Sequence, residues 1–167
     1  VYPADGKDVA KLFTNAENTL LNTQYLWKNS CMYYTKEISK TVARRLELKE
    51  SLFYAIEDKE LLLHYQPIVD LESGNLTGVE ALVRWHHPKF GMLLPEKFIP
   101  LAKETGLIVD LSKWVLKQAC KQPRMWHEAC FKSLSMTINI SAIEFDQAKL
   151  IGHIEGVLAE TGMPPEL

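Results

Sequence analysis

A glutamate and an arginine lie within one stretch of otherwise mostly apolar residues, Gly78-Val79-Glu80-Ala81-Leu82-Val83-Arg84-Trp85, which is typical of a β-strand. Side chains alternate along a strand, so Glu80, Leu82 and Arg84 share one face. Burying an ionised carboxylate costs several kcal/mol unless a cation or hydrogen bonds compensate, and Glu80 therefore needs a partner. At about 3.3 Å per residue, Glu80 and Arg84 stand roughly 13 Å apart, which is too far for a direct ion pair. This spacing suits one ligand that brings both a metal ion and a phosphate.

The composition is that of a soluble globular protein, because the 167 residues are 47% hydrophobic and 24% charged. The formal net charge of -2 gives no reason to expect a polyanionic partner, so we expect neither DNA nor RNA binding. No apolar run approaches the roughly 20 residues of a membrane helix. The sequence begins with Val1 and shows neither a basic nor an apolar leader region. We therefore expect a piece of a longer protein.

The three cysteines, Cys31, Cys120 and Cys130, are an odd number without a Cys-x-x-Cys pair. This pattern is typical of unpaired thiols in a reducing compartment. A zinc site built from Cys120, His127 and Cys130 is the alternative, but no fourth ligand has zinc-like spacing. Because two of these residues stand among apolar helix positions, structural thiols are the favoured interpretation.

The first 60 residues are predicted to form two helices and one short strand. Helical spacing begins after Asp8, which is suited to an N-cap, and residues 31–34 are a candidate strand. Residues 36–60 are predicted to form one long charged amphipathic helix. Such a helix most often links two modules and packs on one of them. Residues 1–35 alone bury too little apolar surface to form a domain.

From residue 61 onward, predicted strands alternate with predicted helices. Residues 61–71 and 76–86 are strands, and the short turn between them makes them antiparallel neighbours. Pro67 indicates a sheet edge or a strand irregularity. His86 and His87 invite a metal assignment, but we interpret both as loop residues.

Proline and glycine mark the helices that follow. A helix starts at Pro95 and runs to Glu104, and Gly106 ends it. A longer helix comes next, and Pro123 should bend or end it. The apolar face of this longer helix consists of Ile108, Leu111, Trp114, Val115 and Ala119.

A third strand is predicted over residues 134–140, with Ser135, Thr137 and Asn139 on one face. A last helix is predicted over residues 147–160. Alternating strands and helices predict an α/β architecture in which the polar faces of the strands gather at one site.

A short pattern near the N-terminus follows a known family. Its residues are Tyr2-Pro3-Ala4-Asp5-Gly6-Lys7-Asp8, Leu12, Asn15-Ala16-Glu17, and Lys28-Asn29 before the candidate strand that ends at Tyr34. The pattern resembles the C-terminal end of a GGDEF (diguanylate cyclase) domain. The signature that names that domain is not in this sequence, so no cyclase activity is implied. The resemblance implies a domain remnant over residues 1–35 and a linker helix over residues 36–60.

A much longer pattern extends from residue 46 to residue 167. Its residues include Tyr65-Gln66-Pro67-Ile68-Val69, Gly78-Val79-Glu80-Ala81-Leu82-Val83-Arg84-Trp85, Pro88, Gly91, Pro95, Phe98-Ile99-Pro100, Gly106-Leu107-Ile108, Trp114-Val115-Leu116, Ala119-Cys120, Asn139-Ile140-Ser141 and Phe145. This pattern resembles the N-terminal part of an EAL domain. The resemblance implies that residues 61–167 form part of a TIM-like (β/α)8 barrel whose first strand is antiparallel to the rest. It also implies hydrolysis of cyclic di-GMP to linear pGpG with two divalent cations, Mg²⁺ or Mn²⁺.

The resemblance assigns roles to five residues. Glu80 and Asn139 are implied to be metal ligands, Arg84 to contact the dinucleotide phosphate, and Gln66 and Leu82 to line the nucleotide pocket. Carboxylate and amide oxygens suit hard cations, and a guanidinium can donate two hydrogen bonds to a phosphate. Ordinary alternatives exist for each residue taken singly. Glu80 could pair with a lysine, Asn139 could bond strand-end backbone, and Arg84 could be an exposed strand residue.

Two departures from the family limit the expected activity. Ala102-Lys103-Glu104 stands where family members usually have Ala-Glu before the glycine, so Lys103 either reshapes the pocket or lies on the surface. The family's further acidic ligands and catalytic lysine are expected beyond Leu167, so we expect no catalytic residue and no turnover in this chain. One alternative is a catalytically inactive EAL domain that acts as a cyclic di-GMP receptor or relay. Another is a truncated product that does not fold stably.

The resemblance also implies partners and a location. The expected ligand is cyclic di-GMP, and a homodimer through the EAL domain is expected. Upstream GGDEF or sensory domains are expected in the parent protein. We expect a cytoplasmic location, and membrane anchoring of the parent by other segments stays open.

Overall fold

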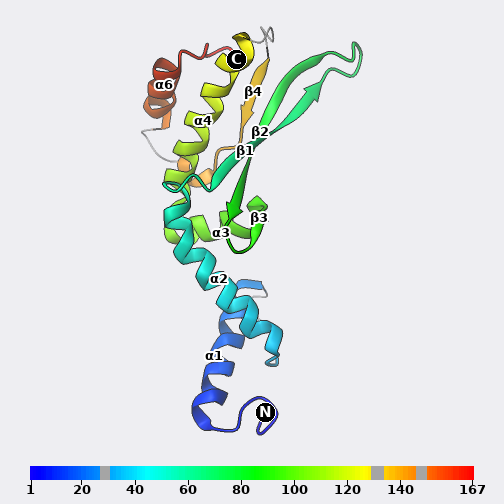
Figure 1. Cartoon of the computed structure of the whole chain (residues 1–167), viewed down its shortest axis with the longest axis vertical. Helices are drawn as coiled ribbons and strands as arrows, with labels where there is room; N and C mark the ends of the chain where they lie inside the picture. The colour runs from blue at the N-terminus through cyan, green and yellow to red at the C-terminus, as the bar shows by residue number, and fades with distance from the viewer. Residues whose placement is uncertain (27–30, 129–133, 146–149) are drawn as a thin grey trace. The chain divides into compact units, whose positions relative to one another are not determined.

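The computed structural model describes residues 1–26, 31–128, 134–145 and 150–167 (Figure 1). The chain divides into two compact units, Val1–Ser51 and Leu52–Leu167, and each is described by itself. The elements follow in the order α1 (Val9–Leu26), α2 (Lys36–Ala55), β1 (Leu61–Val69), β2 (Leu76–His87), β3 (Gly91–Leu93), α3 (Pro95–Thr105), α4 (Ile108–Glu128), β4 (Ser135–Ile138), α5 (Ala142–Phe145) and α6 (Leu150–Thr161).

The N-terminal unit is built on α1 and most of α2. Asp8 caps α1 as predicted, because its Oδ1 accepts a hydrogen bond from the backbone N–H of Lys11 at 2.7 Å. Residues 31–35 form neither helix nor strand, so the predicted strand over residues 31–34 is wrong. A strand needs a neighbour for its backbone N–H and C=O groups, and no other strand lies in the described part of this unit.

The helix predicted over residues 36–60 ends earlier, at Ala55. A turn follows in which Lys59 adopts a left-handed backbone conformation with φ of 58°. A helix cannot continue through that conformation, and the backbone N–H of Glu60 returns to the carbonyl of Ala55 at 3.3 Å. Glu60 is therefore outside the helix and directly precedes β1.

The C-terminal unit contains a four-stranded sheet with β2 at its centre (Figure 1). β1 pairs with β2 in antiparallel orientation, as the short turn predicted. On the opposite edge of β2, β4 lies parallel to its first half and β3 antiparallel to its last residues. The prediction missed β3 and interpreted His86 and His87 as loop residues. Both belong to β2, because three residue pairs with β3 extend the strand.

The two faces of β2 are covered differently. Val79, Ala81 and Trp85 are almost fully buried, while Glu80 and Arg84 on the other face are partly exposed. The predicted alternation is therefore confirmed. Trp85 packs edge-to-face on Phe98 of α3, with ring centroids 5.7 Å apart.

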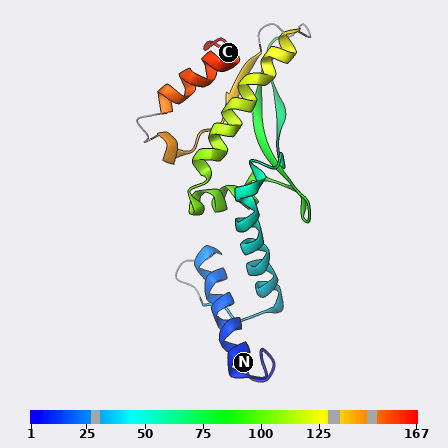
Figure 2. The same ribbon diagram turned by 60° about the vertical axis from the view of Figure 1, so that its left-hand side comes forward.

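Helices form a layer beside the sheet, and α4 runs along β4 and α6 in both views (Figure 1; Figure 2). Gly106 ends α3 in a left-handed conformation, as predicted. α4 continues through Pro123 to Glu128, so of the two predicted outcomes, a bend or an end, the proline does not end the helix. A proline removes one helical hydrogen bond, and the bonds on either side hold this helix together.

The helical layer is joined by a small apolar cluster of α4, α6 and the segment after it. Its buried members are Leu116, Cys120, Val157 and Met163, and Met136 and Ile138 of β4 pack against them. An ion pair between Lys117 and Glu160 at 2.7 Å connects α4 to α6. No helix in the described ranges is long and apolar enough to span a bilayer.

The sheet is open, since among the described strands β1 pairs only with β2, β3 and β4 pair only with β2, and no strand joins the two edges of the sheet. The backbone N–H of Met136 in β4 donates to the carbonyl of Leu167 at 2.7 Å. The end of the described chain thus lies against the backbone of β4.

Candidate functional site

Glu80 and Asn139 meet on the open face of the sheet. The side-chain amide of Asn139 donates from Nδ2 to Oε1 of Glu80 at 2.6 Å. The parallel register of β2 and β4 explains this contact, because it places Thr137 beside Glu80 and brings the end of β4 to the same level. The expected gathering of polar side chains is observed for this pair.

Gln66 and Arg84 lie on the same face as Glu80. Gln66 is the direct partner of Glu80 across the β1–β2 ladder, and residues paired in this way point to the same side. The guanidinium of Arg84 donates from Nη1 to the carbonyl of Val83 at 2.8 Å. Leu82 lies between Glu80 and Arg84 along the strand and is half-buried. The structure therefore places these four strand residues on one surface, where Asn139 hydrogen-bonds to Glu80.

The donor atoms of this pair fit part of a site for a hard cation. Glu80 offers one charged oxygen ligand and Asn139 one neutral oxygen ligand, which Mg²⁺ and Mn²⁺ accept. The amide nitrogen of Asn139 is occupied by Glu80 Oε1, which leaves Oε2 and the amide oxygen as donor atoms. No group of three or more His, Cys, Asp or Glu side chains in the described residues could hold a metal ion. The pair alone is thus an incomplete coordination sphere.

A hollow of about 350 Å³ borders Asn139 and extends between β2, α3 and α4. Leu82, Lys103 and Asn139 line it, and most of the remaining wall is apolar. Lys103 is the residue that departs from the family pattern. The structure therefore places this lysine at a hollow that Asn139 also lines.

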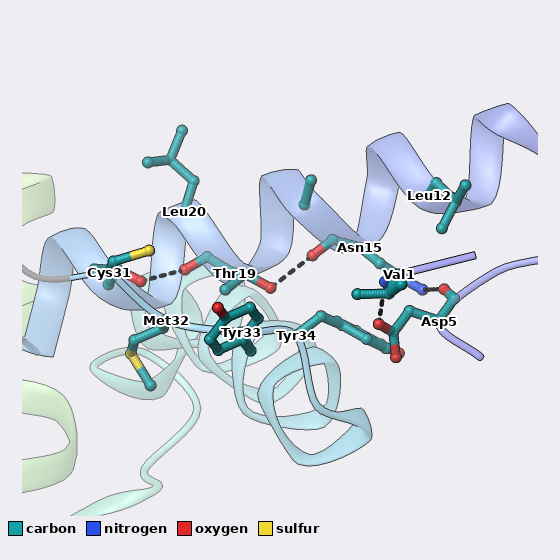
Figure 3. A pocket seen from close by; sticks show the side chains of 12 residues that line it. Val1, Asp5, Leu12, Asn15, Thr19, Leu20, Cys31, Met32, Tyr33 and Tyr34 are labelled. Carbon is teal, nitrogen blue, oxygen red and sulfur yellow. Dashed lines mark hydrogen bonds and ion pairs between the residues drawn. The ribbon is translucent and has the colours of Figure 1, made fainter. Parts of the chain in front are cut away.

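A second hollow of about 350 Å³ lies in the N-terminal unit (Figure 3). Asn15 is buried there, and its Nδ2 donates to the carbonyl of Asp5 at 2.5 Å. Within the described residues its Oδ1 has no hydrogen-bond partner. The carboxylate of Asp5 pairs with the amino group of Val1. None of the five predicted site residues lines this hollow.

The alternative zinc site cannot be assembled from described side chains. Cys120 is buried in the α4–α6 cluster, and burial raises the pKa of its thiol. Cys130 and the side chain of His127 lie outside the described residues. Cys120 itself is a packed core residue, as the structural interpretation predicts.

Two further residues have positions that sequence reasoning did not single out. Thr137 is the residue beside Glu80 in β4, and its place on the polar face of that strand was the available signal. Glu60 accepts a hydrogen bond from the indole Nε1 of Trp85 at 2.8 Å, a contact between residues 25 positions apart. His87 is buried, and its Nδ1 accepts from the backbone N–H of Lys89 at 3.0 Å, which gives it a structural role.

Comparison with known proteins defines the class of this chain. Residues 49–167 match the EAL domain family, and the chain belongs to that family. The fold agrees, since an open α/β sheet with its first strand antiparallel is an incomplete barrel of the EAL type.

The chain is similar to several known signalling proteins. It is 34% identical over 165 residues to the bifunctional diguanylate cyclase/cyclic di-GMP phosphodiesterase MucR of Pseudomonas aeruginosa, covering 99% of this chain and 24% of that protein. It is 34% identical over 163 residues to the cyclic di-GMP phosphodiesterase NbdA of the same organism. This match covers 98% of this chain and 21% of that protein. The solved structure of the MucR phosphodiesterase in complex with c-di-GMP has 40% identity and a TM-score of 0.69, covering 71% of this chain and 48% of that one. This chain thus spans less than a quarter of the length of these two relatives.

Proposed function

We propose that this chain is part of a cyclic di-GMP signalling protein whose EAL domain hydrolyses cyclic di-GMP to linear pGpG. The observation that carries the proposal is the contact of Glu80 with Asn139 at 2.6 Å on the open face of the sheet. The names of the MucR and NbdA relatives support the choice of substrate. Family membership alone would not choose between hydrolysis and binding.

The residues of this chain take distinct roles in the proposal. Glu80 and Asn139 hold divalent cations, Mg²⁺ or Mn²⁺, through their oxygen atoms. Such cations, when bound, activate the attacking water and neutralise charge on the phosphate oxygens. Arg84 binds the dinucleotide phosphate through its guanidinium. Gln66 and Leu82 line the nucleotide pocket on either side of Glu80.

We propose that these 167 residues alone do not turn over substrate. The described residues supply two oxygen ligands in contact and no third acidic ligand beside them. A two-metal site needs more ligands than this pair provides. We place the remaining acidic ligands and the catalytic lysine of the family in other parts of the parent protein.

A receptor function is the second candidate, and Lys103 is the observation that favours it. This cation lines the same hollow as Asn139, at a position where family members usually have an acidic residue. A positive charge there favours an anionic ligand over a second metal ion. In such a receptor the chain binds cyclic di-GMP and passes the signal through α2.

The N-terminal unit fits the same setting. We propose that residues 1–35 are the C-terminal end of a GGDEF domain and that residues 36–60 link it to the EAL domain. The Asp8 cap and the helix α1 are the features that support this proposal. The start of the EAL match at residue 49 lies inside the proposed linker.

The proposal is tested by calorimetric titration of the chain with cyclic di-GMP in the presence of Mn²⁺, together with chromatographic detection of pGpG. We expect weak binding that Arg84→Ala reduces about tenfold or more, because a charge-assisted phosphate contact is lost. Lys97→Ala, an exposed cation on α3, is the matched control and should leave the affinity unchanged. Absence of binding would contradict the recognition of cyclic di-GMP by this chain. Turnover above a buffer-plus-metal control that Glu80→Ala abolishes would contradict its predicted inactivity.

A further inference from the structure

Glu60 joins the end of α2 to the strand that holds Arg84. Its backbone N–H donates to the carbonyl of Ala55, the last residue of α2, at 3.3 Å. Its backbone carbonyl accepts from the N–H of His86 at 2.8 Å. Its carboxylate Oε2 accepts from the indole Nε1 of Trp85, also at 2.8 Å. One residue thus bonds the helix end and two successive residues of β2.

Trp85 is fixed by burial, by strand pairing on both sides and by ring packing. It is fully buried, pairs with Leu61 of β1 and Leu93 of β3, and packs on Phe98 of α3. A buried indole N–H needs an acceptor, and the Glu60 carboxylate is the one it has. The direction of the indole ring is therefore fixed by a hydrogen bond as well as by packing.

Arg84 directly precedes Trp85 and points to the opposite face of β2. The two side chains share one strand backbone, so a shift of that backbone at residues 85 and 86, where Glu60 bonds it, also moves Arg84. Arg84 is half-buried and its own hydrogen bond goes to the neighbouring carbonyl of Val83. The Glu60 bonds to residues 85 and 86 link this part of β2 to the end of α2.

The turn before Glu60 shows backbone strain. Lys59 is a lysine with φ of 58°, a conformation that residues with a Cβ rarely adopt. Such a conformation persists only where the surrounding contacts fix it. The bonds of Glu60 to Ala55, Trp85 and His86 directly follow this residue.

We propose that Glu60 is a positioning residue that sets the orientation of Arg84 toward the dinucleotide phosphate. The inference rests on the proposed cyclic di-GMP function for its ligand, but its geometric part concerns this chain alone. It also assigns the Tyr54–Glu60 turn as the point at which a change in α2 reaches the open face of β2.

The test uses the ¹⁵N-labelled 167-residue chain and the variants Glu60→Ala, Glu60→Gln and Glu57→Ala. Glu57 is an exposed carboxylate in the same turn and serves as the matched control. In Glu60→Ala we expect the Trp85 indole N–H and the His86 amide to exchange about tenfold faster, since both lose or loosen an acceptor. The Arg84 Nε–H resonance should shift, and the dissociation constant for cyclic di-GMP should rise about tenfold. Glu60→Gln retains an acceptor oxygen and should restore the resonance of Arg84 and an affinity within about twofold of the wild type.

Two results would overturn the inference. In the first, the indole resonance moves in Glu60→Ala while the Arg84 resonance stays in place. In the second, amide exchange at Met136 accelerates as much as amide exchange at His86. Met136 lies in β4 and its N–H donates to Leu167, so equal acceleration would show a general loss of stability. If the wild-type chain does not bind cyclic di-GMP, the proposed function fails, and the Arg84 resonance in the variants still decides whether Glu60 positions that side chain.

Discussion

The two faces of β2 differ in burial and polarity, although their residues alternate along the same strand. Val79, Ala81 and Trp85 turn toward the helices and are at most 6% exposed. Glu80 and Arg84 turn away and remain partly exposed beside the end of β4. The buried face stabilises the unit through apolar contact, and the open face carries the polar atoms to which the proposed function assigns the ligand. Truncation of an apolar side chain on the buried face should therefore change stability, and truncation of a polar side chain on the open face should change binding.

Truncation of Trp85 should have the largest effect on stability. Trp85→Ala leaves a cavity between β2 and Phe98 and removes the donor to Glu60. We expect a loss of about 3–5 kcal/mol in the free energy of unfolding, measured by urea denaturation. Leu82→Ala on the open face is the control and should cost less than about 1.5 kcal/mol, because that side chain is only half-buried. Equal losses for the two variants would break the distinction between the faces.

Adding a methyl group at Gly78 should have the second-largest effect on stability. A Cβ at this position would lie 2.8 Å from the carbonyl oxygen of Ser135 in β4 and closer still to its hydroxyl. We expect Gly78→Ala to destabilise the unit by about 1–3 kcal/mol, as measured by thermal unfolding. The same change in a Ser135→Ala background should remain destabilising, since the carbonyl stays in place. Full recovery in that background would show that β2 and β4 are not fixed at this distance.

Removal of the ion pair between Lys117 and Glu160 should have the smallest effect on stability. The hydrogen bond from Lys117 holds the pKa of Glu160 below its ordinary value. A carboxyl group whose pKa is lower in the folded state stabilises that state above its unfolded pKa and loses this effect as the pH falls through the folded value. We expect the urea midpoint of the wild type to fall slightly more between about pH 5 and pH 3 than that of Glu160→Gln.

Glu155→Gln, an exposed carboxylate on the same helix, is the control for this ion pair and should keep the wild-type pH dependence. The same pH profile in wild type and Glu160→Gln would show that the bond between α4 and α6 contributes nothing in solution.

Local patterns predicted much of the fold and of the site. The alternation along residues 78–85 placed Glu80 and Arg84 on one face, and the α/β order predicted that strand ends gather. The contact of Glu80 with Asn139 follows from those two rules once β4 is parallel to β2. The Asp8 cap and the Gly106 terminus were also evident, because each depends on residues close in the sequence.

Other features depend on contacts that the local sequence does not encode. The strand predicted over residues 31–34 is absent because a strand requires a partner, and none lies in the described part of its unit. The end of α2 at Ala55 follows from the left-handed Lys59, a residue type that gives no warning of that conformation. The role of Glu60 depends on Trp85, which is distant in the sequence and near only in the fold.

In the proposed function, Glu80 and Asn139 together hold a divalent cation on the open face of β2 and β4. Titration of the ¹⁵N-labelled chain with Mn²⁺ tests it directly, because a bound paramagnetic ion broadens the resonances closest to it. We predict selective broadening of the Asn139 side-chain amide and the Glu80 backbone amide, at Mn²⁺ concentrations that rise about tenfold or more in Glu80→Gln. Broadening that is unchanged in Glu80→Gln, or that centres on α6, would contradict the account.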